Sequence, residues 1–217
     1  MNRIINIKIK NNSYKINIED NSIKKKLNKI ISLEKKVIFL IDKNVFYVFK
    51  KLRNYKKQNY IVINCSEKIK SFDNFAKISE KILKMGIDRN SLIVSIGGGS
   101  LGDLSGFIAS TLLRGIDLVL VPTTLLSQVD SSIGGKNGIN TINGKNLVGT
   151  FYQPKNVLID PSLLLTLPKR EILSGYSEIV KHSIIKDKKF FYWLDKNKKN
   201  VLNLEKNIVS EAIYKSI

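Results

Sequence analysis

Four short apolar runs most strongly constrain how this chain of 217 residues can fold. They cover residues 37–41, 60–63, 92–96 and 118–121. Apolar runs of this length, interrupted here only by Ser95, are typical of parallel strands that are covered on both faces. The segments between them, such as residues 72–85, repeat apolar residues at helical spacing. Strands that alternate with helices predict an α/β fold, a Rossmann-like parallel sheet with helices on both faces.

Both ends of the chain depart from this alternation. The first 18 residues predict a β-hairpin, because isoleucines alternate with polar residues on either side of a polar break at 11–13. From residue 169 onwards the pattern is helical, with one apolar stripe formed by Ile172, Leu173, Tyr176, Ile179, Val180 and Ile184. A last helical pattern reaches Ile217 without a stop signal, which suggests a chain cut short. We expect an α/β domain over residues 1–167 and an incomplete all-helical domain over residues 168–217.

Composition restricts the partners and the compartment. The apolar runs are too short to cross a bilayer, and the N-terminus alternates where a signal peptide would be continuously apolar, so we expect a cytoplasmic protein. The net charge of +19 is spread along the chain without interleaved aromatic residues. A codon bias towards lysine, asparagine and isoleucine explains it, and neither nucleic acid nor a membrane is expected as a partner. The single cysteine excludes an internal disulfide, and the single histidine limits any internal zinc site.

Three consecutive glycines follow the third apolar run. Gly97, Gly99 and Gly102 satisfy the pattern G-x-G-x-x-G between a predicted strand and a predicted helix. Without side chains at these positions, phosphate oxygens can reach backbone N–H groups at the positive end of the helix. The pattern alone also fits a tight turn in which glycine serves packing, and it lacks the acidic partner of the ordinary dinucleotide fingerprint.

Two further segments combine glycine with lysine. QVDSSIGGKNGIN at residues 128–140 places Asp130 and Lys136 in a predicted loop, and GKN at 144–146 repeats the combination. Thr123 and Thr124 come directly after the fourth apolar run. Such loops suit phosphate, because backbone donors and a mobile cation share its charge. Together with the glycine-rich helix start, they predict two anionic ligands, a dinucleotide and a phosphorylated substrate.

Residues 97–154, from GGGSLGD to FYQP, resemble the 3-dehydroquinate synthase family of sugar phosphate cyclases. The likeness extends through SEKIKSF at 66–72 and TLPKREILSGYSEIVKH at 166–182. It implies a lyase of the shikimate pathway, which leads to chorismate and the aromatic amino acids. Such an enzyme converts 3-deoxy-arabino-heptulosonate 7-phosphate to 3-dehydroquinate and phosphate. The resemblance further implies a homodimer, a divalent metal (zinc or cobalt) and NAD that is reduced and reoxidised in each turnover.

The resemblance also assigns roles to individual residues. It implies that the cofactor-binding positions are Asp42, Asn44, Glu67, Lys70, Gly99, Ser100, Leu101, Gly102, Asp103, Thr123, Thr124, Lys136, Lys145, Leu163 and Thr166. The catalytic and substrate-contacting positions that it implies are Asp130, Lys136, Asn146, Lys181 and Arg114, of which the last reaches a substrate in the partner subunit. Each residue also has a plain structural reading, such as a helix cap at Asp42 or a surface pair of Arg114 with Asp117.

Glu178 is the metal ligand that the resemblance implies. It shares one helix face with Lys181 and His182, and a solvated surface cluster would have the same sequence. The spacing allows His182 to join Glu178 on a metal. The resemblance implies instead that the other two metal ligands follow in a later segment. Two of the three expected metal ligands are then absent from this chain. A separately encoded C-terminal half is then a candidate partner. Two alternatives stay open: an NAD-binding remnant without catalysis, or a related NAD-dependent polyol dehydrogenase.

Overall fold

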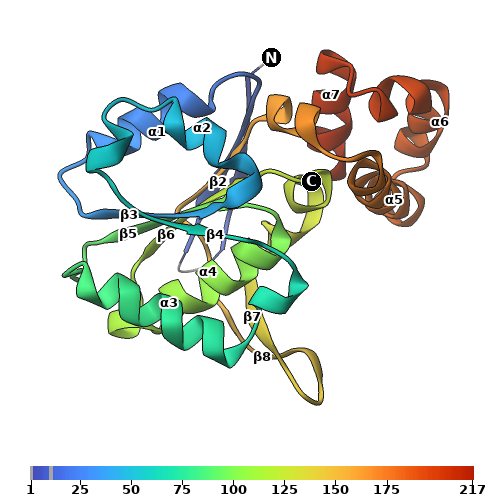
Figure 1. Cartoon of the computed structure of the whole chain (residues 1–217). Coiled ribbons are helices and arrows are strands. Elements are labelled where there is room, and N and C mark those ends of the chain that lie inside the picture. The colour runs from blue at the N-terminus through green and yellow to red at the C-terminus, as the bar shows by residue number, and fades with distance from the viewer. Residues whose placement is uncertain (1, 10–11) are drawn as a thin grey trace.

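The computed structural model describes residues 2–9 and 12–217 as an α/β body followed by three helices (Figure 1). Seven strands form one sheet in the order β1-β2-β9-β6-β5-β3-β4, in which only β1 runs antiparallel to its neighbour among the described pairings. The bounds are β1 (Asn2–Ile7), β2 (Tyr14–Glu19), β3 (Val37–Asp42), β4 (Asn59–Ile63), β5 (Leu92–Gly97), β6 (Asp117–Pro122) and β9 (Asn156–Ile159). The predicted fold class and N-terminal hairpin are confirmed, although residues 10 and 11 lie outside the described residues.

Helices cover both faces of the sheet. In Figure 1, α1 (Ile23–Ile31) and α2 (Phe46–Lys50) lie on one side of it, and α3 (Phe72–Lys84) and α4 (Gly99–Thr111) lie on the other. Strand β3 alternates between the two: Ile38 and Leu40 pack with α3 and α4, whereas Phe39 and Ile41 pack with α1 and α2. The apolar runs at 37–41, 92–96 and 118–121 are therefore buried on both faces, as predicted. Strand β4 is not, because it forms the edge of the sheet and is only half-buried.

Strand β9, which the sequence analysis did not include, inserts between β2 and β6. The residue after it, Asp160, is buried and accepts hydrogen bonds from the backbone N–H groups of Asn21, Ser22 and Ile23, at 2.9, 2.8 and 3.0 Å. The carboxylate of Asp160, which is distant in the sequence, therefore satisfies backbone N–H donors at the start of α1. It ties the N-terminal hairpin and α1 to the centre of the sheet.

Both glycine-lysine segments contribute to strands, from residue 136 in the first and throughout 144–146 in the second, so their prediction as loops was wrong for these residues. They lie in an antiparallel hairpin of β7 (Lys136–Thr141) and β8 (Gly144–Phe151), which projects below α4 in Figure 1. Gly138 faces Gly149 in this pairing, and a Cβ on Gly138 would lie 2.9 Å from the carbonyl oxygen of Val148. These two glycines serve the close approach of the strands. The turn into β7 uses Gly134 and Gly135, which have positive φ angles of 89° and 69°.

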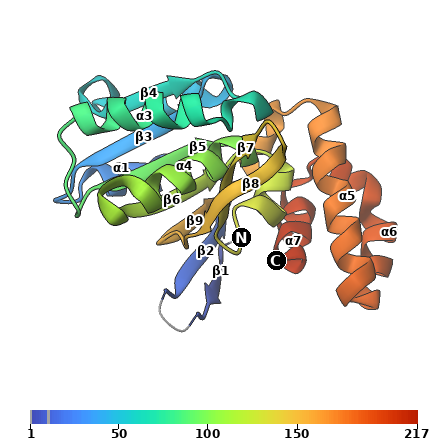
Figure 2. The same ribbon diagram turned by 90° about the horizontal axis from the view of Figure 1, so that it is seen from below.

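The change to helical structure at residue 169 is confirmed. The three helices are α5 (Lys169–Lys186), α6 (Lys188–Leu202) and α7 (Lys206–Ser216), and they pack beside the carboxyl end of the sheet (Figure 2). The buried face of α5 contains Ile172 and Ile179, but Leu173 and Ile184 of the predicted stripe are exposed. The missing side chain of Gly175 explains this orientation, because it lets the face of α5 that contains Ile172 and Ile179 pack closely against residues 125–126. Within the described ranges, no helix is long and apolar enough to cross a membrane.

Candidate functional site

A crevice opens where the connections of the sheet change direction. Strands β3 and β5 are neighbours, but the chain leaves β3 towards β4 and leaves β5 towards β6. Ligands of open α/β sheets bind at such a point, outside the carboxyl ends of the strands. Here Asp42 ends β3 and Gly97 ends β5, and a pocket of about 770 Å³ lies beside them. The topology therefore positions this pocket as a ligand site.

Most of the predicted cofactor residues meet in this pocket. Its lining includes Asp42, Asn44, Glu67, Gly99, Ser100, Leu101, Asp103, Thr123, Thr124, Leu163 and Thr166. Gly102 lines a small adjoining cavity. The structure places the three predicted lysines elsewhere. Lys70 is buried beneath the pocket wall, Lys136 lines a second pocket, and Lys145 is exposed on β8.

The start of α4 has the properties of an anion seat. Its N-cap, Gly98, is extended, and among the described residues no side chain caps it. The first N–H groups of a helix lack partners within the helix, and they carry the positive end of its dipole. A Cβ on Gly99 would lie 2.6 Å from Oγ of Ser131, whereas a Cβ on Gly102 would meet no described atom within 4 Å, so the helix start is open at Gly102. The glycine-rich turn thus fits the pyrophosphate of a dinucleotide.

A buried lysine connects this pocket to the hairpin. The Nζ of Lys70, a side chain only 3% exposed, donates to Asp103 Oδ2 at 2.6 Å and to Asn146 Oδ1 on β8. Burial raises the pKa of Asp103, and the ammonium of Lys70 opposes that rise. The backbone of Asn146 has a positive φ of 58°, and its N–H donates to Asn140 Oδ1 at 3.0 Å. Lys70 therefore neutralises Asp103 and helps to hold Asn146 in place.

Glu67 joins the same network from the rim of the pocket. It accepts hydrogen bonds from Ser100 Oγ and Asn140 Nδ2, both at 2.9 Å. Burial alone would raise the pKa of Glu67, but these two hydrogen bonds and the charges of Lys70 and Lys145 together lower it. Glu67 is thus held in its ionised form between the helix start and the hairpin.

A second pocket, of about 520 Å³, lies between α4 and the hairpin. Its lining includes Asp130, Lys136 and Asn146, three of the residues predicted to contact substrate. Asp103 and Ser131 line both pockets, so the two cavities share a wall. The sequence analysis did not single out Ser131, whose only signal is that it follows Asp130. Its buried Oγ has no hydrogen-bond partner among the described residues, which leaves it available to a ligand.

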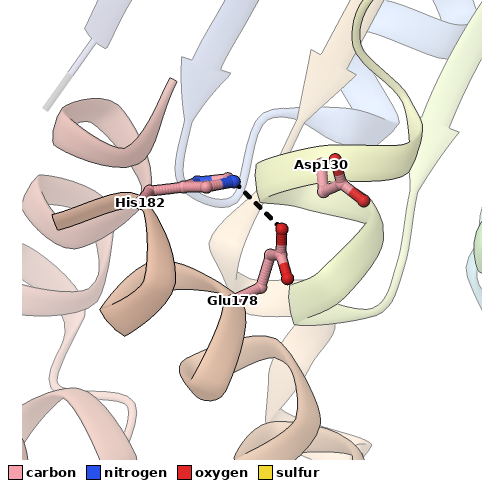
Figure 3. A group of neighbouring side chains, drawn as sticks. All are labelled: Asp130, Glu178 and His182. Carbon is pink, nitrogen blue, oxygen red and sulfur yellow. Dashed lines mark ion pairs between the residues drawn. The ribbon is translucent and has the colours of Figure 1, made fainter. Parts of the chain in front are cut away.

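Asp130, Glu178 and His182 converge at the edge of the second pocket (Figure 3). Asp130 lies on the short π-helix Ser127–Ser131, and the other two lie on α5. One ligand atom from each side chain lies within 4.8 Å of the others. The side chains of Glu178 and His182 are only 17% and 24% exposed, so this is not the solvated surface that the sequence also allowed.

The neighbours of Glu178 set its charge. Burial would raise the pKa of Glu178, but the Lys181 ammonium and His182 together hold it below its usual value. Oε1 of Glu178 is buried, and its contacts with Lys181 and His182 lack the geometry of ordinary hydrogen bonds. Two carboxylates and an imidazole are ligands that zinc takes in proteins. The donor set therefore fits a divalent metal.

Two of the predicted substrate-contacting residues lie outside both pockets. Lys181 is largely exposed beside Glu178. Arg114 is exposed in the turn that follows α4, where its φ is 69°. The surface pair of Arg114 with Asp117 does not form in the described structure, because Asp117 pairs with Lys35 at 2.9 Å and with Lys155 at 3.5 Å.

The fold and the paired pockets define a Rossmann-like protein with a ligand site outside the carboxyl ends of its parallel strands. A family model described as 3-dehydroquinate synthase N-terminal matches residues 60–174, and one described as 3-dehydroquinate synthase C-terminal matches residues 175–217. The chain belongs to the 3-dehydroquinate synthase family. The 3-dehydroquinate synthase of Pelagibacter ubique (strain HTCC1062) is 45% identical over 222 residues, which cover 98% of this chain and 60% of that protein. This chain spans about 60% of the length of the curated relatives it matches.

Two solved structures show the same fold. ValA (2-epi-5-epi-valiolone synthase) from Streptomyces hygroscopicus subsp. jinggangensis 5008, with NAD+ and Zn2+ bound, superposes with a TM-score of 0.84 at 25% identity, over 97% of this chain and 61% of that one. A 2-deoxy-scyllo-inosose synthase complexed with carbaglucose-6-phosphate, NAD+ and Co2+ superposes with a TM-score of 0.71 at 26% identity, over 83% and 51%. Relatives of this chain thus bind NAD+ together with a divalent metal.

Proposed function

We propose that this chain forms the NAD-binding and phosphate-binding part of a 3-dehydroquinate synthase. The reaction is the conversion of 3-deoxy-arabino-heptulosonate 7-phosphate to 3-dehydroquinate and phosphate. The observation that carries the proposal is that Asp103 and Ser131 line both pockets, so the two pockets adjoin each other. A cofactor bound in one pocket would therefore lie next to a substrate bound in the other. Family membership and the NAD+ of both solved relatives support the same conclusion.

The chain's own residues bind and orient the reactants in this proposal. Backbone N–H groups at the start of α4 hold the pyrophosphate, and Asp42 at the end of β3 binds the adenosine ribose. Lys136 and Asn146 hold the phosphorylated substrate in the second pocket, where Asp130 accepts a hydrogen bond from a substrate hydroxyl. NAD, when bound, would take a hydride from a ring carbon and later return it, and the temporary ketone acidifies the neighbouring C–H so that phosphate can leave.

The remaining parts of the proposal concern the metal, the partners and the location. Glu178 would hold a divalent metal, zinc or cobalt, which polarises substrate hydroxyls. Arg114, exposed and outside both pockets, suits a homodimer in which it reaches the partner's substrate. We also propose an NAD-binding domain over residues 1–167, a helical domain that begins at residue 168, a separately supplied C-terminal half as partner, and a cytoplasmic location.

Phosphate release tests the proposed function. The chain is incubated with the heptulosonate phosphate, NAD+ and Zn2+, alone and together with the remaining C-terminal part of the Pelagibacter ubique relative. In the mixture that contains the C-terminal part, we expect release of phosphate without accumulation of NADH. Accumulation of NADH would instead favour a polyol dehydrogenase. NAD+ binding without phosphate release in either mixture would favour a binding protein without catalysis.

A further inference from the structure

We infer that a pocket at the amino ends of β5, β6 and β9 binds a small organic anion with an aliphatic body, a short-chain alkyl carboxylate. Its volume of about 600 Å³ lies in the range of small-molecule sites. Leu92, Asp117 and Asn156, the first residues of the three strands, line it together with residues of α1. None of its described lining residues also lines either pocket of the candidate functional site. The inference therefore concerns a separate site and does not depend on the proposed function.

The floor of this pocket is aliphatic. Val119 of β6 and Leu158 of β9 contribute to it, and both belong to the core between the sheet and α1. Ile30 near the end of α1 is half-buried, and Leu33 in the segment that follows α1 is 43% exposed. An alkyl chain that lies on these side chains would remove apolar surface from water, which favours binding in proportion to the area covered.

Lysines surround the aliphatic floor. Lys26 and Lys29 lie three residues apart on α1 and therefore share one face of that helix. Lys35 and Lys155 line the pocket from the segments that precede β3 and β9. Among the described lining residues, Asp117 is the sole acidic one, and it already pairs with Lys35 at 2.9 Å and with Lys155 at 3.5 Å. The remaining positive charge favours an anion.

Lys26 supplies the hydrogen-bond donor that an anion would need. Its Nζ is buried and has no hydrogen-bond partner among the described residues, although it lies 3.0 Å from Oε2 of Glu19. An ammonium group has three N–H donors, and buried polar groups are almost always hydrogen-bonded. A carboxylate oxygen in the pocket would accept a charge-assisted hydrogen bond from Lys26.

The lysines and the aliphatic floor together specify the ligand. The carboxylate would lie at Lys26 and Lys29, and the alkyl chain would extend over Val119 and Leu158. Small-molecule sites are commonly built in this way, with a mostly apolar lining and a few polar groups that fix the orientation of the ligand. A simple inorganic anion would leave the floor uncovered, and a neutral alkyl compound would leave Lys26 without an acceptor.

Titration of the full chain with hexanoate tests this inference. Acetate, which has the charge without the chain, and hexanamide, which has the chain without the charge, are the comparison compounds. We expect hexanoate to bind at one site at least tenfold more tightly than either, as measured by calorimetry. In 15N NMR spectra, the backbone amides of Leu92, Val119 and Leu158 should shift on addition of hexanoate.

Variants of α1 test the role of the lysines. Lys26→Met should weaken hexanoate binding about tenfold, because it removes a charge-assisted hydrogen bond. Lys29→Gln changes an exposed side chain that the fold does not need, and it should weaken binding by about fivefold. Lys24→Met, at an exposed position of α1 outside the described lining, is the matched control with unchanged affinity. Circular dichroism of each variant verifies folding.

Three results would overturn the inference: equal affinity for hexanoate and hexanamide, wild-type affinity in both Lys26→Met and Lys29→Gln, or amide shifts confined to the other two pockets. A hexanoate affinity that falls as the concentration of the chain rises would also overturn it, because a second copy would then fill the pocket. Saturating NAD+ should leave hexanoate binding unchanged, and displacement of hexanoate by NAD+ would contradict a separate site. Failure of NAD+ to bind would refute only the proposed function.

Discussion

The ammonium of Lys70 lies 2.6 Å from Oδ2 of Asp103, at a position where the lysine is almost completely buried. The same Nζ donates to Asn146 Oδ1 on β8, so one charge joins the start of α4 to the hairpin. A buried charge is stable only when it is paired and hydrogen-bonded, because burial removes its hydration. This ion pair therefore holds together the wall between the two pockets.

Lys70→Met is expected to destabilise the protein by about 1–3 kcal/mol, because it leaves the part-buried carboxylate of Asp103 without its partner. Urea unfolding at neutral pH measures the loss. Lys68→Met, an exposed lysine two residues away, is the matched control and should change stability by less than about 0.5 kcal/mol. Replacing both partners, in Lys70→Met with Asp103→Leu, should recover part of the loss. Equal stability of Lys70→Met and the wild type would contradict the structural role of the pair.

Glu67 should make stability depend on pH in the acid range. Its folded pKa lies below its unfolded value, so ionised Glu67 stabilises the fold above the unfolded pKa, and this contribution is lost as the pH falls through the folded pKa. The difference in Tm between the wild type and Glu67→Gln should be greatest near neutral pH and shrink below about pH 4. Thermal unfolding across this range measures it. Glu80→Gln, at an exposed position of α3, is the control, and a difference that grew on acidification would contradict the sign.

Gly102→Ala should separate stability from cofactor binding. A Cβ there meets no described atom within 4 Å, and alanine favours a helix over glycine by about 1 kcal/mol, so the variant should be slightly more stable. The added methyl group would also fill space beside the proposed pyrophosphate seat, and we expect NAD+ affinity to fall about tenfold. Thr111→Ala, at the far end of α4, should leave NAD+ affinity unchanged. Higher stability with unchanged NAD+ affinity would show that the pyrophosphate does not contact this turn.

Gly175→Ala should weaken both the fold and the metal site. A Cβ on Gly175 would lie 2.6 Å from the backbone nitrogen of Leu126, so α5 must move away from the segment that leads to Asp130. We expect a loss of about 1–3 kcal/mol of stability in urea unfolding, together with weaker Zn2+ binding. Ser174→Ala changes the neighbouring exposed position and should affect neither property. Full Zn2+ affinity in a destabilised Gly175→Ala would mean that this contact does not set the distance between Glu178 and Asp130.

Much of the architecture could be predicted from local patterns. Strands β3, β5 and β6 could be predicted from apolar runs, because both faces of these strands are covered and nearly all of their side chains are therefore apolar. The hairpin β7–β8 was missed because glycine, asparagine and lysine are also residues of turns and loops. Strand β9 has only four residues, too few for a periodic pattern. Both errors concern strands whose residue types or length do not distinguish them from loops.

The sequence by itself determined the alternation of strands and helices up to β6, the helical character after residue 169 and the position of the glycine-rich helix start, because hydrophobic period and glycine spacing are local properties. Only the tertiary structure decided that Lys70 meets Asp103 and Asn146, which are 33 and 76 residues away. It also decided that Asp130 meets Glu178 and His182 across two helices. A periodic pattern records which face of an element is buried but not which distant element covers it, and that choice depends on packing at the carboxyl end of the sheet.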